Sequence, residues 1–587
     1  MVIPVKALSR SSFGQFDAKV TGSWPNDISG HIFIVGPHHR PRERHLFVGT
    51  GVVVRWDLKA ENGRIRVHSK PLQTWDGFWQ ELFPWTWKGG YFPASISLLG
   101  IAEIANTAVV KMDGRVFLTA DAGRYWEIDP VSLKTITPVG YFDEHVITAP
   151  GLAFPMVMNT AHPFYEPDSS LLLGCELKAR PRLENIWGDM VCHPYIYMWD
   201  GKSNLKQWKV DGVELDGSTH SLVVTERCVL VPDMPFQMGF STVLGLKIPP
   251  VSPYPQTQIH VVDRSALVEN TETVPARLVT FPGDSYHFLW NYRHTQEGHI
   301  QLCAIQQSTL GLTQAIEDDD INHFTGQRFQ PEFWGIPWMF AFDPGILRKV
   351  TIKVEPQDTR TLNTETFIHP GWWSTQLFTA DPREQFSAEG YSAIYQVYGG
   401  FYRDLLSRRQ YLQFRDDLNR ILVDEEIPLQ DLPSVLTRIP LNEDWDSLTA
   451  DLLAEQAAHP ELPLASLGSS RLDFYVFPEG YLLDSVQFIP EGQGYILTTV
   501  LFQEYYEGWL FAANDLKGGA IAKISLPEGV NFGFTLHSEY LQSLSSQRPP
   551  YQVNRVLSAV RSLTKVPVKT ITEAFKIICK SQMKRFR

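Results

Sequence analysis

Short runs of apolar and polar residues with the character of β-strands recur over some 500 residues of the chain. The clearest is a hairpin over Thr107–Ala120, in which two apolar runs flank the turn dipeptide Asp113-Gly114. Further strands are predicted over His31–Val35, Ser221–Pro232, Gln258–Val262, His299–Gln306 and Tyr495–Ala513. The dominance of such runs predicts a mainly β protein.

The near absence of helical patterns between these runs excludes a parallel α/β sheet, because parallel strands need crossover helices. A large sandwich or barrel remains open, but many short antiparallel strands favour a β-propeller. No fixed-period repeat, such as a recurring Trp-Asp dipeptide, is visible in the sequence. The prediction of a propeller therefore depends only on the number of short strand-like runs.

Three segments interrupt the β pattern. Residues 76–103 are rich in Trp, Phe and Leu, and residues 403–456 have an acidic, helical pattern that predicts an insertion. Residues 554–587 predict one or two basic amphipathic helices interrupted near Pro567. Their apolar side is expected to comprise Val556, Leu557, Val560, Leu563, Ile571, Phe575 and Ile578. We therefore expect a propeller domain over 1–553, with a helical insertion at 403–456, and a separate tail over 554–587.

Charge is distributed unevenly along the chain. The 587 residues carry 52 Lys and Arg against 65 Asp and Glu, a net charge of −13, which argues against a nucleic-acid partner. The tail from 554 to 587 nevertheless holds nine basic residues and one acidic residue, Glu573. Five cysteines without a CxxC pair predict neither a disulfide framework nor a thiolate zinc site. No secretory leader and no apolar run of about 18 residues is visible, so we expect a cytoplasmic protein.

Four histidines share a setting beside or within strand-like apolar segments, whereas the common nucleotide, hydrolase and zinc-protease motifs are missing. They are His162, His220, His287 and His537. Neutral imidazole is the commonest metal ligand and suits iron, copper and zinc. The alternative is four histidines packed at the core or rim without a metal, and spacing alone does not decide between the two. Among the other histidines, His294, His299, His323 and His459 lie in polar stretches and are expected at the surface, and His193 and His369 precede prolines in turn-like sequences.

Several motifs in a fixed order resemble the carotenoid cleavage oxygenase family, which includes the retinal-pigment-epithelium isomerase and stilbene-cleaving oxygenases. Ile28–Pro37 is similar to the family's opening strand, and His45–Trp56 resembles its His-x-Phe-Asp-Gly-x-Gly-Met motif with Val48 and Val52 replacing Asp and Met. Ala105–Pro130 is similar to the Asn-Thr hairpin. The four segments around the histidines, and FIPEGQGYILTTVLF before the last of them, also resemble family motifs.

The resemblance implies a seven-bladed propeller with a helical and loop cap over its iron-bearing face. It implies one Fe(II) per chain, held by His162, His220, His287 and His537. Leu536 and Ser538 flank the fourth ligand where the family has Phe and Gly, which implies a reshaped cavity with the ligand retained. For the three carboxylates that the family places behind its histidines, the motifs indicate Asp121, one methylene shorter than the usual Glu, together with Glu491 and Glu384, with Glu389 as an alternative to Glu384.

The function that the resemblance implies is oxidative cleavage of a C=C bond of a carotenoid or apocarotenoid with O2, giving two carbonyl products. A stilbene-type phenolic alkene is an alternative, although GIAEIANT before the hairpin lacks the Tyr that binds the phenol in those relatives. Retinoid isomerohydrolysis on the same iron is another. A non-catalytic propeller that binds a partner is an alternative of another class.

A hydrophobic polyene substrate dissolves in membranes, so the enzyme needs a route from a bilayer to the iron. The aromatic segment 76–103 suits a bilayer interface, although its side chains could equally cap the propeller core. The basic tail 554–587 is a second candidate, with a solvated or disordered end as the alternative. We therefore expect peripheral attachment to a membrane through both segments.

Overall fold

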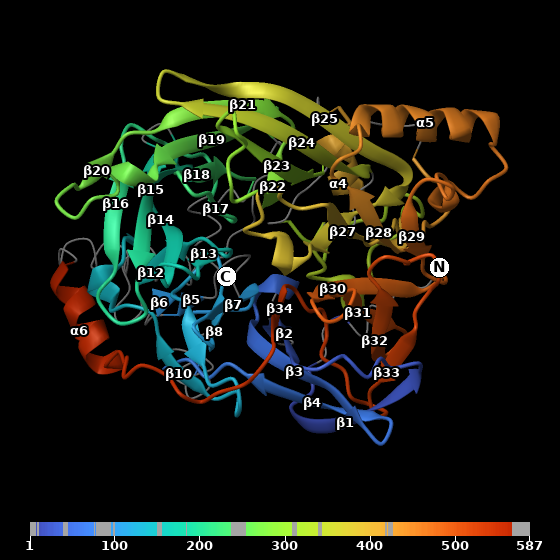
Figure 1. Cartoon of the computed structure of the whole chain (residues 1–587), viewed down its shortest axis with the longest axis horizontal. Helices are drawn as coiled ribbons and strands as arrows, with labels where there is room; N and C mark the ends of the chain where they lie inside the picture. The colour runs from blue at the N-terminus through green and yellow to red at the C-terminus, as the bar shows by residue number, and fades with distance from the viewer. Residues whose placement is uncertain are drawn as a thin grey trace.

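The computed structural model describes residues 8, 11–38, 45–75, 77, 96–97, 100–101, 103–149, 155–182, 185–235, 254–307, 314–338, 343–416, 420 and 427–565 of the chain. The protein is mainly β, as predicted, and its sheets stand side by side around a common centre in a propeller-like ring (Figure 1). Most of the aromatic segment 76–103 and of the tail after Lys565 lies outside the described residues.

Four of the sheets are separate four-stranded antiparallel blades built from strands that follow one another in the chain. They comprise β7 (Ala108–Met112), β8 (Arg115–Thr119), β9 (Trp126–Ile128) and β10 (Thr135–Pro138); β17 (Val223–Val224), β18 (Cys228–Asp233), β19 (Gln256–Asp263) and β21 (Arg277–Pro282); β22 (Ser285–Trp290), β23 (His299–Gln306), β24 (Pro344–Glu355) and β25 (Asp358–Trp373); and β26 (Thr375–Thr379), β27 (Ala393–Tyr398), β28 (Val435–Pro440) and β29 (Asp473–Val476). The expected hairpin is formed by β7 and β8. Its turn residues Asp113 and Gly114 have φ of 50° and 76°, as a tight hairpin turn requires.

Two larger sheets complete the ring. The nine-stranded sheet runs in the order β30 (Tyr481–Ile489), β31 (Tyr495–Phe502), β32 (Tyr505–Ala512), β33 (Ala522–Ser525), β1 (Gly14–Gly22), β4 (Arg64–Pro71), β3 (Thr50–Glu61), β2 (His31–His38) and β34 (Ser538–Leu541). The seven-stranded sheet contains β11 (Ile147–Ala149), β12 (Met156–Asn159), β14 (Leu171–Arg182), β15 (Asn185–Trp199), β16 (Lys206–Val210) and β20 (Thr273–Val274), with β13 (Phe164–Glu166) beside β14. A small pair consists of β5 (Ile96–Ser97) and β6 (Gly100–Ile101).

The sheets thus form four separate four-stranded blades, whereas seven separate blades were expected. The reason is that β1, near the start of the chain, pairs antiparallel with β33, near its end, with Val20 opposite Ile524. This pairing satisfies the backbone groups of two strand edges that would otherwise be exposed. It fuses strands from both ends of the chain into one sheet and closes the ring (Figure 1).

In the described part of the chain the two longest helices, α5 (Trp445–Ala458) and α6 (Arg555–Lys565), lie at the outside of the ring (Figure 1). Segment 403–456 contains α4 (Arg408–Phe414) and α5 (Trp445–Ala458), but also β28, which pairs with β27 and β29 inside a blade. The N-cap of α5 is Asp444, whose side chain accepts from the backbone N–H of Ser447 at 2.9 Å. Helix α6 (Arg555–Lys565) lies in the predicted tail. Single-turn helices are η1 (Leu46–Val48), η3 (Phe142–Glu144), η4 (Arg264–Ala266), η5 (Pro331–Phe333), η6 (Pro382–Glu384), η7 (Arg403–Leu405) and η9 (Leu464–Ser466).

Two long connections leave from the same end of the ring. Ser285, at the start of β22, pairs with Gln306 at the end of β23, and Thr375, at the start of β26, pairs with Tyr398 at the end of β27. The Thr375 hydroxyl donates to the carbonyl of Gln306 at 3.2 Å, so both strand ends lie together. The connections 307–343 and 399–434 start there.

The described parts of these two connections pack against each other. The guanidinium of Arg409 pairs with Asp320 at 2.7 Å and lies 4.5 Å above the ring of Trp338. They therefore form a joined layer beyond the strand ends. Among the described residues, no helix is long and apolar enough to span a bilayer.

Candidate metal centre

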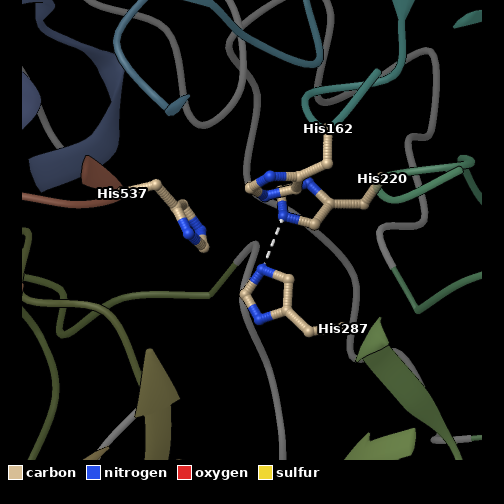
Figure 2. A group of neighbouring side chains, drawn as sticks. All are labelled: His162, His220, His287 and His537. Carbon is tan, nitrogen blue, oxygen red and sulfur yellow. Dashed lines mark hydrogen bonds between the residues drawn. The ribbon is translucent and has the colours of Figure 1, made fainter. Parts of the chain in front are cut away.

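The four histidines singled out in the sequence lie together, and their imidazoles point toward one another (Figure 2). His162 lies between β12 and β13, His220 just before β17, His287 within β22 and His537 just before β34. One ligand nitrogen from each lies within 4.8 Å of all the others. Two of these nitrogens, Nε2 of His220 and Nε2 of His287, are 3.2 Å apart.

Backbone pairing fixes the first two histidines relative to each other. The N–H of His162 donates to the carbonyl of His220 at 3.0 Å, and the N–H of Leu222 donates to the carbonyl of His162 at 3.3 Å. The Thr160 hydroxyl also donates to the carbonyl of His220, at 2.9 Å. The two segments therefore act as a short parallel pair that presents both imidazoles at one point.

Two glycines allow the close backbone approaches that place His220 and His537. A Cβ at Gly36, in β2, would lie 2.6 Å from the carbonyl oxygen of Phe534, and one at Gly217 would lie 1.9 Å from that of Met234. The N–H of Leu536 donates to the carbonyl of Val35 at 2.7 Å across the first of these approaches. Larger residues at 36 and 217 would push away the segments that carry the two histidines.

Burial keeps three of the four imidazoles, those of His162, His287 and His537, neutral. Burial, with a contribution from the neighbouring histidines, holds the pKa of His162 and His287 well below the usual range and lowers that of His537 to about 3. Neutral imidazole is the form that binds a metal. The group therefore offers unprotonated nitrogen lone pairs at neutral pH.

Asp121 orients one of the four rings. It follows β8 directly, and its Oδ1 lies 2.7 Å from Nδ1 of His220. Because the ionised carboxylate only accepts hydrogen bonds, Nδ1 carries the proton and Nε2 presents its lone pair to the other imidazoles. The N–H of Asn159 donates to the carbonyl of Asp121 at 2.9 Å, which ties this loop to the strand leading to His162.

These residues fit a transition metal such as iron. Nε2 of His162 and Nδ1 of His287 are buried and have no hydrogen-bond partner among the described residues. A buried polar atom without a partner is costly, and a metal ion shared by the four rings would satisfy the nitrogen of His162. An all-imidazole set suits iron, copper or zinc and does not suit magnesium or calcium.

The two glutamates indicated by the sequence bond elsewhere in the described structure. Glu384 accepts from the backbone N–H of Ser392 at 2.9 Å, and Glu491 accepts from the phenol of Tyr540 at 2.6 Å. The alternative, Glu389, is exposed and accepts from the Ser387 hydroxyl at 2.6 Å. Only Asp121, of these carboxylates, hydrogen bonds to one of the four imidazoles within the described part of the chain.

His294, which was expected at the surface, is buried, and so is His369, which precedes a proline. His294 accepts from or donates to the Thr225 hydroxyl at 2.9 Å, and His369 stacks on Trp372 at 3.9 Å between ring centroids. Burial lowers the pKa of His369 to about 3. Thr225 lies 69 residues from His294, and Nε2 of His369 lies 3.1 Å from the carbonyl oxygen of Leu467, 98 residues away, so the neighbouring sequence does not reveal either contact.

The sequence analysis missed one buried acid beside the site. Asp484 of β30 is fully buried, and one of its oxygens accepts from the N–H and the hydroxyl of Thr535, at 2.7 and 2.6 Å, two residues before His537. Burial raises its pKa well above the usual range. It stands in the apolar-rich run Tyr481–Ile489, where nothing local distinguishes it from a surface acid.

A protein family model and a relative of known name each match part of this chain. Residues 9–385 match the family model of the retinal pigment epithelial membrane protein. Over 255 residues the chain is 28% identical to resveratrol cleavage oxygenase 1 of Chaetomium globosum; this stretch is 38% of the chain and 36% of that relative, so about a third of the relative's length is matched.

Solved structures share the fold over almost the whole chain. A variant of the apocarotenoid oxygenase of Synechocystis covers 92% of this chain and 98% of its own, with a TM-score of 0.57 and 16% identity. The lignostilbene dioxygenase of Pseudomonas brassicacearum covers 91% and 97%, with a TM-score of 0.54 and 16% identity. At this identity the likeness concerns the fold.

Proposed function

The chain belongs to the family of the retinal pigment epithelial membrane protein, and on that premise we propose that it is a non-haem Fe(II) dioxygenase. Its reaction is cleavage of a C=C bond of a carotenoid or apocarotenoid, in which the two atoms of O2 become the oxygens of two carbonyl products. The observation that supports this proposal most is the group of four imidazoles whose ligand nitrogens lie within 4.8 Å of one another. One Fe(II) per chain is the proposed cofactor, with His162, His220, His287 and His537 as its ligands.

Iron, when bound, would supply the redox chemistry by which O2 reacts with an alkene. The protein's own part is to hold four uncharged ligands, so that the charge of the ion is not neutralised, and to exclude water from the site. Asp121 keeps the proton of His220 on Nδ1, which leaves Nε2 free to bind. The overall reaction needs no net proton transfer, so no general acid or base is assigned.

We further propose that the nine-stranded sheet counts as two blades joined at the β33–β1 edge, which with the seven-stranded sheet and the four separate blades makes seven. Connections 307–343 and 399–434 start at the end of the ring where Ser285 lies, two residues before His287, and their described parts pack on each other. We propose them as part of a cap over the iron. The division into a propeller over 1–553, with an insertion at 403–456, and a tail over 554–587 is proposed with them.

A stilbene-type phenolic alkene is the second candidate substrate, because the relative with 28% identity is named for resveratrol cleavage. The sequence GIAEIANT, without a Tyr, argues for the polyene instead. Retinoid isomerohydrolysis would use the same metal centre. A non-catalytic propeller in the cytoplasm would need no metal, and metal content therefore separates it from the other candidates.

The deciding experiment is metal analysis of the purified chain after anaerobic loading with Fe(II). We expect about one iron per chain in the wild type and loss of it in His220→Ala. His294→Ala removes a buried histidine outside the group and serves as the matched control, which should keep its iron. A wild type that takes up no iron would refute the proposal.

Substrate class is then tested on the loaded protein under O2. An apocarotenal, β-carotene, resveratrol and a retinyl ester are incubated separately, and the products are identified by mass spectrometry with 18O2. Cleavage of resveratrol alone would replace the polyene with the stilbene. Retinol formed from a retinyl ester without incorporated 18O would indicate the isomerohydrolase.

A further inference from the structure

Residues 548–553, which lead into α6, run along the outside of the blade β7–β10 and are hydrogen bonded to it. Arg548 donates to both carboxylate oxygens of Glu127, at 2.7 and 2.9 Å. The phenol of Tyr551 accepts from the N–H of Gly140 at 2.7 Å, and the N–H of Val553 donates to the Thr137 hydroxyl at 3.0 Å. These bonds place the start of α6 at a defined position on the rim, beside β10 (Figure 1).

Three polar residues in the described part of α6 contact the rest of the protein. Ser558 is fully buried, and its hydroxyl oxygen accepts from the N–H of Phe142 at 2.9 Å and from Nη1 of Arg124 at 3.2 Å. Arg555 donates to the carbonyl of Ile136 at 3.1 Å, and the guanidinium of Arg561 lies 4.7 Å above the ring of Tyr141. The helix is therefore docked by its hydrophilic side.

Three apolar residues of α6 face away from the protein. Val556, Leu557 and Val560 are 58%, 40% and 53% exposed. Their spacing of one and four residues puts them on one face of the helix. A surface helix of a globular protein normally has the opposite orientation, with its apolar side on the core.

The same rim receives the end of the aromatic segment 76–103. Arg124 donates to Glu103 through Nε at 2.7 Å and Nη2 at 3.1 Å while its Nη1 holds Ser558. Arg124 is three residues after Asp121, which orients His220. This rim is therefore at the end of the blade that lies nearest to the four histidines. Two segments more than 400 residues apart in the chain thus meet at one arginine.

We propose that α6 is an anchored docking helix for an anionic lipid bilayer, in which Val556, Leu557 and Val560 enter the interface and the basic tail binds the lipid headgroups. Charge complementarity selects this occupant, because residues 554–587 have nine basic residues and one acidic residue in a chain of net charge −13. With α6 bound to the membrane, the end of the ring nearest to the four histidines, together with the end of segment 76–103, faces the bilayer. The inference deepens the proposed use of a membrane-dissolved substrate and does not depend on iron.

The test is sedimentation of the full-length protein with vesicles of phosphatidylcholine alone or mixed with phosphatidylserine. We expect binding to the mixed vesicles that weakens as NaCl is raised. The triple variant Val556→Gln, Leu557→Gln, Val560→Gln should reduce binding by about tenfold or more, since it removes the apolar contribution and keeps every charge. Leu453→Gln, a residue 50% exposed on α5 at the other side of the ring, is the matched control and should bind like the wild type (Figure 1).

Unchanged binding of the triple variant, or no binding of the wild type to mixed vesicles, would overturn the proposal. So would a triple variant that differs from the wild type in oligomeric state, because the apolar face would then join copies of the chain. Iron content and melting temperature are measured on each variant. A wild type that binds vesicles through α6 but takes up no iron would refute the proposed function and leave this inference intact.

Discussion

Nδ1 of His220 lies 2.7 Å from Oδ1 of Asp121, a residue 99 positions earlier in the chain. Both side chains are buried, and the bond determines which nitrogen of the imidazole is free for a metal. Asp121 follows β8 in one blade, whereas His220 precedes β17 in another. A bond between two blades therefore sets the chemistry of the central group.

Replacing Asp121 by Asn should weaken metal binding by about 10- to 100-fold, because the amide no longer stabilises the Nδ1 proton as a carboxylate does. The affinity is measured anaerobically by competition between the protein and a chromophoric Fe(II) chelator. Asp121→Glu is the matched control; it keeps the charge and should bind iron more tightly than Asp121→Asn. Equal affinity of Asp121→Asn and wild type would show that the bond has no part in metal binding.

Metal binding should stabilise the fold. At a free Fe(II) concentration of about 100 times Kd, the free energy of unfolding should rise by about 2.7 kcal/mol, since only the folded chain brings the four histidines together. Melting temperature with and without Fe(II), under nitrogen, is the measurement. His287→Ala should lose the stabilisation and His294→Ala should keep it; an equal rise in both variants would place the metal elsewhere.

Asp484 should make the protein less stable as pH rises. Its pKa is raised in the folded state by burial, so above about pH 4 the unfolded chain releases a proton that the folded chain retains. The unfolded state is then favoured progressively with pH, by about 1.4 kcal/mol per unit, until the folded-state pKa is reached. Asp484→Asn keeps an oxygen acceptor for Thr535 and removes the titration. Urea midpoints of the two proteins between about pH 4 and pH 8 should diverge in favour of the variant; parallel curves would contradict a protonated Asp484.

Glu127 should matter more for stability than its partner Arg548. The side chains of Glu127 and Arg115 are 1% and 2% exposed, and Glu127→Gln leaves the charge of Arg115 buried without a counterion, which should cost about 3–5 kcal/mol. Arg548→Gln leaves the Arg115–Glu127 pair intact and should cost about 1.5–3 kcal/mol. Urea denaturation of both variants measures the difference. A larger loss of stability for Arg548→Gln would mean that Arg548, and not Arg115, is the main counterion of the buried Glu127 carboxylate.

The sequence by itself determined the features that are encoded locally. The alternation of residues and the Asp113-Gly114 turn predicted the β7–β8 hairpin, because a tight turn and a pleated strand depend only on neighbouring residues. Each of the four histidines lies in a short segment similar to a family motif, so the group could be named before its geometry was known. This includes His537, which lies outside residues 9–385 that match the family model.

Only the tertiary structure decided the relationships between distant segments. The pairing of β1 with β33 joined strands from both ends of the chain in one sheet, Glu384 and Glu491 bonded to Ser392 and Tyr540, and His294 and Asp484 were buried. The partner of a carboxylate and the burial of a side chain depend on which segments pack against it, and the partners of Glu491 and Asp484 lie 49 and 51 residues away in the chain. The inward polar side of α6 is of the same kind, since its helical pattern predicts two faces but the contact of Ser558 with Arg124 decides which face is docked.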